Sequence, residues 1–207
     1  MKIIECVQGS DQWHMARLGL PTASEFGRLV TPTGKPSAQA DAYLHRLVAE
    51  RLIGMPVDND TDSPWMTRGS AMEAEAVAFY ELQRGEDTRA VGFVTTDDGL
   101  AGASPDRLVG DDGLLEIKCP SAAVHVGYLL EVEPRKYWPQ LQGQLWVTGR
   151  AWVDFLSYCP GLPPALVRYA RDEEFIAKLA EAVPAFACSV EASYLRLAEM
   201  IGQRRTA

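Results

Sequence analysis

The sequence predicts an α/β domain in which a small mixed β-sheet is flanked by helices. Three observations indicate this class. Apolar residues recur at helical spacing in the first third, short segments rich in Val, Phe and Thr fill the middle, and helical spacing returns at the end. The 207 residues suffice for one large domain and barely for two. We therefore expect a single domain over residues 1–207.

Helices are expected throughout an N-terminal part of about residues 10–85. Ser10 is placed to cap the first helix, and Thr22-Ala-Ser-Glu25 has the capping-box pattern that opens the second. Gly85 follows the last of them and is a typical end signal. The four expected helices cover residues 10–18, 22 onward, 38–53 and 70–84.

The sheet is expected within about residues 86–170. Asp97-Asp98-Gly99 and a second Asp-Asp-Gly at 111–113 are good hairpin turns, so the segments around them should form an antiparallel meander. The other expected elements of this part are a helix over 139–148 and strands over 152–158 and 166–169. From Asp172 to about residue 203 the chain should be helical again, with Pro184 kinking or breaking the helix.

The main chemical pattern is Pro105-Asp106, nine residues, and then Glu116-Ile117-Lys118. Alternate residues of a strand share a face, so Glu116 and Lys118 point the same way. With a three-residue loop and Gly113 in the left-handed conformation, Asp106 lies opposite Lys118 and joins that face. A two-residue loop would put it on the other face. A simple charge pair on an exposed strand remains the alternative for Glu116 and Lys118.

Two carboxylates and an ammonium on one face suit phosphodiester hydrolysis. Carboxylate oxygens and the backbone carbonyl of Ile117 are hard ligands for Mg²⁺, which polarises phosphoryl oxygens and acidifies a bound water. Lys118 can orient the water, deprotonate it or neutralise charge in the transition state. Glu73 lies on the apolar side of an expected helix, where an acid needs a cation or metal unless it reaches water at the edge of that face.

Composition limits the possible partners. The net charge of −8 and the pI of about 4.9 argue against a protein that coats nucleic acid with a broad basic surface, but not against a local basic groove. The four cysteines form no CxxC pair, so we expect reduced thiols and no zinc or redox motif. We expect no membrane segment or signal peptide, because no apolar run is long enough and an acid occurs at Glu5.

Several blocks of residues, taken in order, resemble the phage lambda exonuclease family, or YqaJ-type viral recombinases, of the PD-(D/E)xK nuclease superfamily. They span about residues 8–160, and no pattern after about Leu162 matches. The blocks are Gln8-Gly-Ser10, Trp13, Arg17-Leu-Gly19, Thr22-Ala-Ser24, Arg68-Gly69, Glu73, Ala76, Tyr80, Ser104-Pro-Asp106, Leu115-Glu-Ile-Lys118-Cys-Pro120, Tyr137, Gln140-Leu-Gln142, Val147-Thr-Gly149 and Tyr158-Cys-Pro160.

The resemblance implies a restriction-endonuclease-like core and 5′→3′ digestion of one strand of linear duplex DNA. This would release 5′-phosphomonoesters and leave a 3′ overhang for recombination. Mg²⁺, or Mn²⁺ in its place, would bind Asp106, Glu116 and the carbonyl of Ile117, with support from Glu73, and Lys118 would be the catalytic lysine. The remaining site residues that it implies are Gln142 near the scissile strand and Arg17, Ser24 and Ser104 around a terminal 5′-phosphate.

The resemblance also implies a ring-shaped homotrimer, a single-strand annealing protein as partner, and a phage or prophage protein in the bacterial cytoplasm. Two other functions stay open. Another PD-(D/E)xK enzyme, such as a restriction or repair nuclease, would use the same residues. A non-catalytic DNA-binding module would have lost one of them, whereas Asp106, Glu116 and Lys118 are all present.

Overall fold

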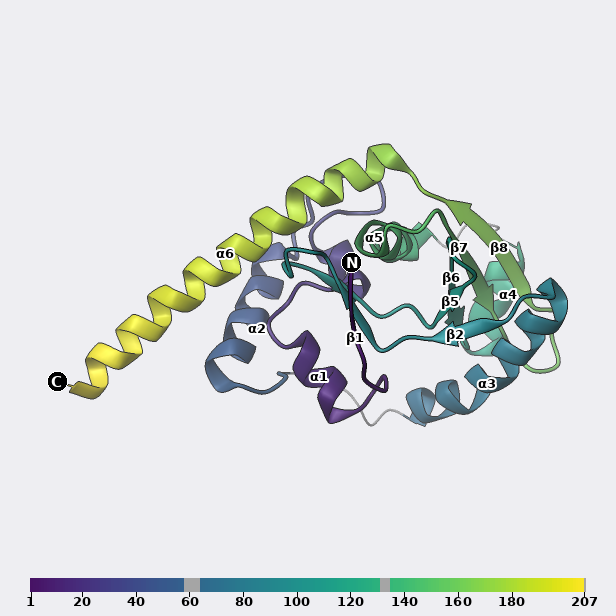
Figure 1. The fold of residues 1–207 in the computed structure, drawn as a ribbon, viewed down its shortest axis with the longest axis horizontal. Coiled ribbons are helices and arrows are strands. Elements are labelled where there is room, and N and C mark those ends of the chain that lie inside the picture. The colour runs from purple at the N-terminus through teal and green to yellow at the C-terminus, as the bar shows by residue number, and fades with distance from the viewer. Residues whose placement is uncertain (58–63, 131–134, 207) are drawn as a thin grey trace.

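Within residues 1–57, 64–130 and 135–206, which the computed structural model describes, two β-sheets lie among the helices (Figure 1). The larger sheet is mixed, because two of its central strands are parallel and its other neighbouring pairs are antiparallel. Its strands, in spatial order, are β2 (Thr88–Ala90), β5 (Arg107–Val109), β6 (Gly113–Lys118), β7 (Trp152–Ser157) and β8 (Ala165–Ala170), with β6 parallel to β7. The predicted α/β class with a small mixed sheet is confirmed.

The smaller sheet corrects the predicted meander. Its strands, in spatial order, are β1 (Lys2–Ile4), β3 (Phe93–Thr95) and β4 (Gly102–Ala103). The turn at Asp97-Asp98-Gly99 does join β3 and β4 as a hairpin, and Gly99 has a φ of 75°. However, β4 and β5 are not paired with each other, since the bent segment Ser104–Asp106 carries the chain from one sheet to the other. Sequence analysis also missed β1.

The expected N-terminal helices all form, with one change of type. They are α1 (Asp11–Arg17), η1 (Ala23–Arg28), α2 (Ala40–Ile53) and α3 (Pro64–Arg84). Ser10 caps α1 as predicted, because its side chain accepts a hydrogen bond from the amide of Trp13. The capping box at Thr22 is wrong. The segment is a 3₁₀-helix, and the Thr22 hydroxyl lies with Arg17 and Ser24 instead of capping the helix.

Different helices cover the two faces of the larger sheet. On one face, Leu115 and Ile117 of β6 pack with Ala76 and Tyr80 of α3. The opposite face carries Leu114 and Phe155, which belong to the main core together with apolar residues of α5 (Trp138–Thr148). A helix that the sequence did not predict, α4 (Ala122–Leu130), packs on this second face, where the ring of Tyr128 meets the ring of Phe155 edge-on.

The chain ends in one long helix, α6 (Glu173–Thr206), which extends well beyond the rest of the protein in Figure 1. Pro184 lies inside α6, which continues through it, so of the two expected effects, a kink or a break, the break does not occur. The helix is fastened to α2 by the stacked rings of Tyr43 and Phe186 and by an ion pair between Arg51 and Glu191.

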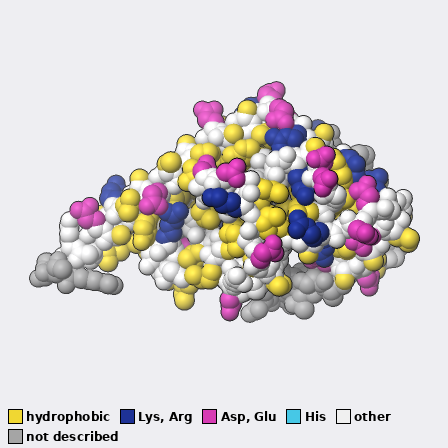
Figure 2. Space-filling model, viewed as in Figure 1, with side chains coloured by type: hydrophobic (Ala, Val, Ile, Leu, Met, Phe, Trp, Pro, Cys, Tyr) yellow, Lys and Arg dark blue, Asp and Glu magenta, His cyan; other side chains and the backbone are white. Residues whose placement is uncertain are grey.

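The surface agrees with the acidic composition. On the face drawn in Figure 2, Lys and Arg side chains are interspersed with Asp and Glu among the residues that are coloured, and they form no continuous basic area. No helix in the described part of the chain has the length and apolar character needed to span a membrane.

Candidate active site

The hairpin of β5 and β6 places Asp106, Glu116 and Lys118 together at one end of the larger sheet. The loop has three residues, 110–112, as expected, but Gly110 adopts the left-handed conformation at φ 48° instead of Gly113. The expected pairing of Asp106 with Lys118 is therefore wrong by two residues, and Asp106 comes opposite Glu116. Because side chains alternate with a period of two, this error leaves all three on the predicted face.

Glu116 is the most constrained of the three side chains. It is only 2% exposed, and both of its carboxylate oxygens accept hydrogen bonds from α5. Gln140 donates to Oε1 at 2.7 Å, and Gln144 donates to Oε2 at 2.6 Å. The ammonium of Lys118 also bonds to Oε1 at 2.5 Å. Three donors thus compensate the buried charge and hold the carboxylate in one orientation.

The pKa values of Asp106 and Lys118 are both raised, but for different reasons. Burial raises the pKa of Asp106 well above its usual value, the negative charge of Glu116 raises it further, and Lys118 opposes both. Burial lowers the pKa of Lys118, but the charges of Glu116 and Asp106 outweigh burial and raise its pKa overall. The backbone amide of Ile117 donates to Asp106 Oδ2 at 2.6 Å, so the backbone of Ile117 lies at this cluster while its side chain packs on the other face.

Glu73 reaches the same end of the sheet from α3. Its carboxylate forms an ion pair of 3.2 Å with Arg107, and its charge contributes to the raised pKa of Asp106. The structure therefore brings Glu73 near the cluster but pairs it with a cation. A supporting role at a metal stays a prediction.

Gln142 lies outside the cluster. It is 0% exposed, donates to the carbonyl of Ala170 at 3.0 Å and accepts from the amide of Asp172 at 2.8 Å. On α5, Gln142 points away from the face that carries Gln140 and Gln144, so it fastens the link between β8 and α6. The residues that reach Glu116 are the i and i+4 pair, and their shared helical face is visible in the sequence.

A second cluster contains the three residues expected around a 5′-phosphate. The guanidinium of Arg17 donates to Ser104 Oγ at 3.2 Å and to Ser24 Oγ at 3.4 Å. It also lies 4.0 Å from the ring centroid of Trp13, whose indole N–H donates to Ser104 at 2.8 Å. Arg17 therefore stacks on Trp13 and faces the two serines at the same time. Contact of this cluster with a 5′-phosphate stays a prediction. Burial lowers the pKa of Arg17.

The backbone around Arg17 is held by residues of α2. The amide of Thr22 donates to the Tyr43 hydroxyl at 3.1 Å, and burial raises the pKa of Tyr43 to about 12. The amide of Gly19 donates to Glu50 at 3.0 Å, and Gly19 has a φ of 64°. A Cβ at Gly19 would come within 2.4 Å of Arg51, so both the backbone conformation and the space require glycine.

The two clusters are joined by a very short piece of chain. Ser104 belongs to the Arg17 cluster, Asp106 belongs to the Glu116 cluster, and Pro105 lies between them. Gln8 fixes this segment, because its amide donates to the carbonyl of Pro105 at 2.9 Å and to that of Val91 at 2.8 Å. Apart from the presence of Gln8 in the first of the resembling blocks, no sequence pattern indicates this contact.

The donor set fits a hard divalent cation only in part. No group of three or more His, Cys, Asp and Glu side chains in residues 1–57, 64–130 and 135–206 is arranged around a metal position. The adjacent carboxylates of Asp106 and Glu116 nevertheless supply the oxygen ligands that Mg²⁺ prefers. Their charges repel each other, which contributes to the raised pKa of Asp106, and a cation bound between them would relieve this repulsion. Asp106 and Glu116 therefore fit Mg²⁺, whereas Glu73 fits only after leaving Arg107.

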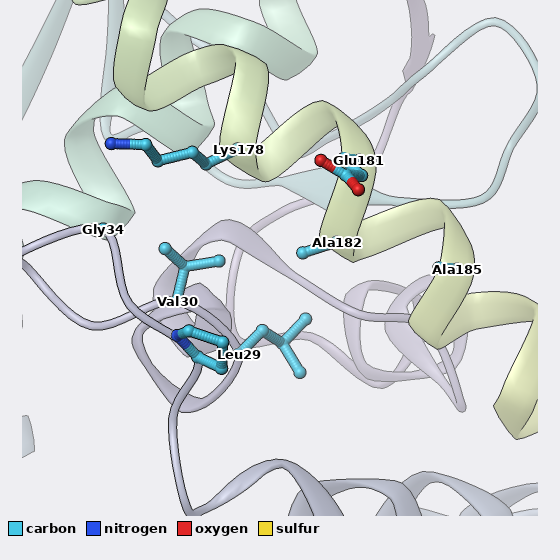
Figure 3. Close-up of a pocket in the computed structure, with 8 residues that line it drawn as sticks. Leu29, Val30, Gly34, Lys178, Glu181, Ala182 and Ala185 are labelled. Carbon is cyan, nitrogen blue, oxygen red and sulfur yellow. The ribbon is translucent and has the colours of Figure 1, made fainter.

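A separate groove of about 330 Å³ lies between the turn at residues 30–36 and α6 (Figure 3). Its sides are mainly apolar, and Lys178 and Glu181 of α6 stand over it. None of its lining residues belongs to either cluster. They are Leu29, Val30, Gly34, Pro36, Lys178, Glu181, Ala182 and Ala185.

Known proteins share this arrangement of elements. Residues 12–151 match the family described as the YqaJ-like viral recombinase domain. An alkaline exonuclease from Laribacter hongkongensis has 34% sequence identity and a TM-score of 0.84, with 94% of this chain and 99% of that chain covered. A structure of that exonuclease in complex with dAMP has a TM-score of 0.83 at the same identity, with 94% and 99% covered.

A phage related exonuclease from Haemophilus somnus 129PT shares the fold, with a TM-score of 0.68 at 15% identity and 87% and 96% of the two chains covered. A search of curated proteins returns no significant match. The fold is thus that of the lambda-exonuclease-like PD-(D/E)xK proteins, and the family match covers more than half of the sequence. The resemblance read from the sequence is confirmed, and the chain belongs to the YqaJ-like viral recombinase family.

Proposed function

We propose that the protein is a Mg²⁺-dependent exonuclease that digests one strand of linear duplex DNA from a 5′-phosphorylated end. The remaining 3′ overhang would serve recombination by strand annealing. The observation that supports this best is the junction of the two clusters through Ser104-Pro105-Asp106, which sets groups suited to a terminal phosphate beside groups suited to phosphodiester hydrolysis. The 34% identity to an alkaline exonuclease supports the reaction class.

In the proposed site, Asp106, Glu116 and the carbonyl of Ile117 hold the metal, and Glu73 supports it. Bound Mg²⁺, or Mn²⁺ in its place, would polarise the scissile phosphate and acidify a water. Gln140 and Gln144 keep the carboxylate of Glu116 from rotating. Lys118 is hydrogen-bonded to Glu116, and it would orient the water, deprotonate it or neutralise charge in the transition state.

The products would be 5′-phosphomonoesters. Water attacking the scissile phosphorus would expel the 3′-oxygen of the terminal nucleotide, which leaves with its own 5′-phosphate, and the scissile phosphate would stay on the shortened strand as its new 5′ end. The proposed partners are a homotrimer of this chain and a single-strand annealing protein. Both follow from the family resemblance.

The decisive experiment compares an end-labelled linear duplex with a closed circle, each with Mg²⁺ and with EDTA. We expect digestion of the linear duplex only, and only with Mg²⁺. Lys118→Ala should lower the rate at least about 10²-fold without unfolding the protein, since loss of a group that stabilises transition-state charge has costs of this order. Equal digestion of the circle would exclude an exonuclease, and near wild-type activity of folded Lys118→Ala would refute the site.

A further inference from the structure

Beside Lys118 lies a group of side chains to which the proposed function has so far assigned no role. We call Tyr128, Lys136 and Tyr137 the tyrosine–lysine cluster. Lys136 and Tyr137 belong to η2 (Arg135–Tyr137), and Tyr128 belongs to α4. The Nζ of Lys136 lies 4.8 Å from the ring centroid of Tyr137 and 5.4 Å from that of Tyr128. The Tyr128 hydroxyl donates to the Tyr137 hydroxyl at 3.4 Å.

The ring of Tyr137 connects this cluster to the proposed catalytic lysine. The Nζ of Lys118 lies 4.9 Å from the same ring centroid, so two ammonium groups from different elements face one aromatic ring. Tyr137 is itself packed against Phe155 of β7, with ring centroids 5.6 Å apart, which fixes its position on the sheet. Both ammonium groups therefore lie against one ring that is itself packed on the sheet.

Lys136 differs from Lys118 in its surroundings. Lys118 is half-buried and bonded to Glu116, whereas Lys136 is exposed. A hydrogen bond with Tyr128 raises the pKa of Lys136, so this side chain is charged at any pH at which the protein works. Lys136 thus offers a charged, accessible ammonium at the same aromatic ring that Lys118 contacts.

The chemistry that fits such a group is a second phosphate. The protein carries a net charge of −8, so it must hold a polyanion through local cations. A strand whose scissile phosphate lies at Asp106, Glu116 and Lys118 carries a further phosphate on each neighbouring nucleotide, and each contact with a cation adds to affinity and to its salt dependence.

We propose that Lys136, held by Tyr128 and Tyr137, binds the backbone phosphate next to the scissile one. This inference rests on the proposed function, because it names a further contact of the same DNA strand. Lys136 takes part in binding and in no chemical step. Tyr137 is a positioning residue, which keeps the ammonium groups of Lys118 and Lys136 aligned with successive phosphates.

The test compares Lys136→Ala with Lys178→Ala. Both variants remove one positive charge, but Lys178 lies on α6 in an ion pair with Glu174. Binding of a 5′-labelled duplex is measured in EDTA across a series of salt concentrations, and digestion is measured separately with Mg²⁺. For Lys136→Ala we expect roughly three- to tenfold weaker binding near 100 mM salt and a slope of log K against log salt that is smaller by about one. Its kcat should stay within about twofold of wild type.

Lys178→Ala should match wild type in affinity and slope. If Lys136→Ala has the same slope as Lys178→Ala, the phosphate contact does not exist. A wild-type protein that digests no DNA would refute the proposed function separately, and the salt slope would still decide the contact.

Tyr137 is tested with two variants. Tyr137→Phe keeps the ring and should retain kcat, whereas Tyr137→Leu removes it and should lower kcat about tenfold or more with a smaller change in KM, because Lys118 loses the group that aligns it. Equal kcat values for the two variants would overturn the positioning role.

Discussion

At the scale of single residues, the site holds two carboxylates in electrostatic conflict, because their negative charges repel each other. Asp106 and Glu116 are neighbouring carboxylates, and burial adds to the cost of ionising Asp106. A group with a raised folded pKa contributes stability below its unfolded pKa, and that contribution is lost as the pH rises through the folded pKa. Metal-free protein should therefore lose stability through this group as the pH rises from the ordinary titration range of an aspartate to the raised pKa of Asp106, and a bound cation should restore it.

The first prediction follows from this conflict. Asp106→Asn removes the charge but keeps the shape, so without metal it should raise the unfolding temperature at neutral pH by about 2 °C or more. It should also abolish hydrolysis. Mg²⁺ should stabilise the wild type and leave Asp106→Asn nearly unchanged. Calorimetry at pH 5 and 7.5, with Mg²⁺ and with EDTA, measures all of these effects. If Asp106→Asn is the less stable protein in EDTA at pH 7.5, the carboxylates do not repel each other as described.

The second prediction separates the glutamines of α5. Gln144→Leu leaves a carboxylate oxygen of the buried Glu116 without its donor, which should cost about 1–3 kcal/mol of stability and at least about tenfold in kcat. Gln142→Leu should cost comparable stability, because it unfastens Ala170 and Asp172, but should change kcat much less. Urea unfolding and steady-state rates for the two variants provide the comparison. If Gln142→Leu lowers kcat more than Gln144→Leu does, Gln142 belongs to the active site.

The sequence predicts much of the site at this scale and fails in identifiable places. Strand alternation together with a three-residue loop is enough to bring Asp106, Glu116 and Lys118 to one face, and an error of two residues in register does not change that result. The choice of Gln142 fails because a likeness of motifs says nothing of which way a helix is turned. The contact of Gln8 with Pro105 joins residues far apart in the chain, and no local pattern contains it.

At the scale of elements, the turn between α1 and η1 carries the expected phosphate-binding group. Gly19 and Thr22 are held against α2 by Glu50 and Tyr43, and the side chain of Arg17 donates to the hydroxyl of Thr22. The guanidinium is therefore presented to the two serines by a fixed backbone, which lowers the entropy lost when an anion binds.

The third prediction concerns the substrate end. Wild type should prefer a duplex with a 5′-phosphate over the same duplex with a 5′-hydroxyl, because a phosphomonoester carries more charge and a guanidinium grips it with two donors. Arg17→Ala should lose most of this preference. Arg28→Ala, which removes an arginine of η1 that pairs with Glu25, is the control and should keep it. Equal rates of the wild type on both ends would mean that Arg17 is only a structural partner of Trp13.

Elements were predicted best where one signal dominates. Ser10 and Gly85 set the limits of their helices as expected, and both Asp-Asp-Gly turns form hairpins. The 3₁₀-helix after Thr22 was not expected. The Thr22 hydroxyl was expected to cap an α-helix, but it accepts a hydrogen bond from Arg17 instead. The short strand β1 and the helix α4 were missed because neither carries a clear period, and tertiary contacts decide them.

At the scale of the whole molecule, net charge matters. A trimer of this chain would carry a formal charge of about −24, three times −8. Such a particle cannot retain DNA by bulk attraction, and salt weakens the local contacts that remain. A closed ring around the duplex would retain it by topology instead.

The fourth prediction is the oligomer itself. Light scattering after size exclusion should give about three times 22.7 kDa. The protein should also digest long stretches of duplex in a single encounter when an excess of unlabelled competitor is added after binding. A stable monomer at working concentrations would refute the ring, while leaving the chemistry of a single site untouched.

Pro105 limits the distance between the two clusters. Ser104, which would face the terminal phosphate, and Asp106, which would lie at the bond to be cut, are separated by this one proline, and two peptide units span at most about 7 Å. Gln8 restrains this segment further, because its side-chain amide donates a hydrogen bond to the carbonyl of Pro105. The length of each released product would thus be set by the protein backbone and not by the DNA sequence. Each new 5′ end that binds at Arg17 would lie at the same distance from the next bond to be cut.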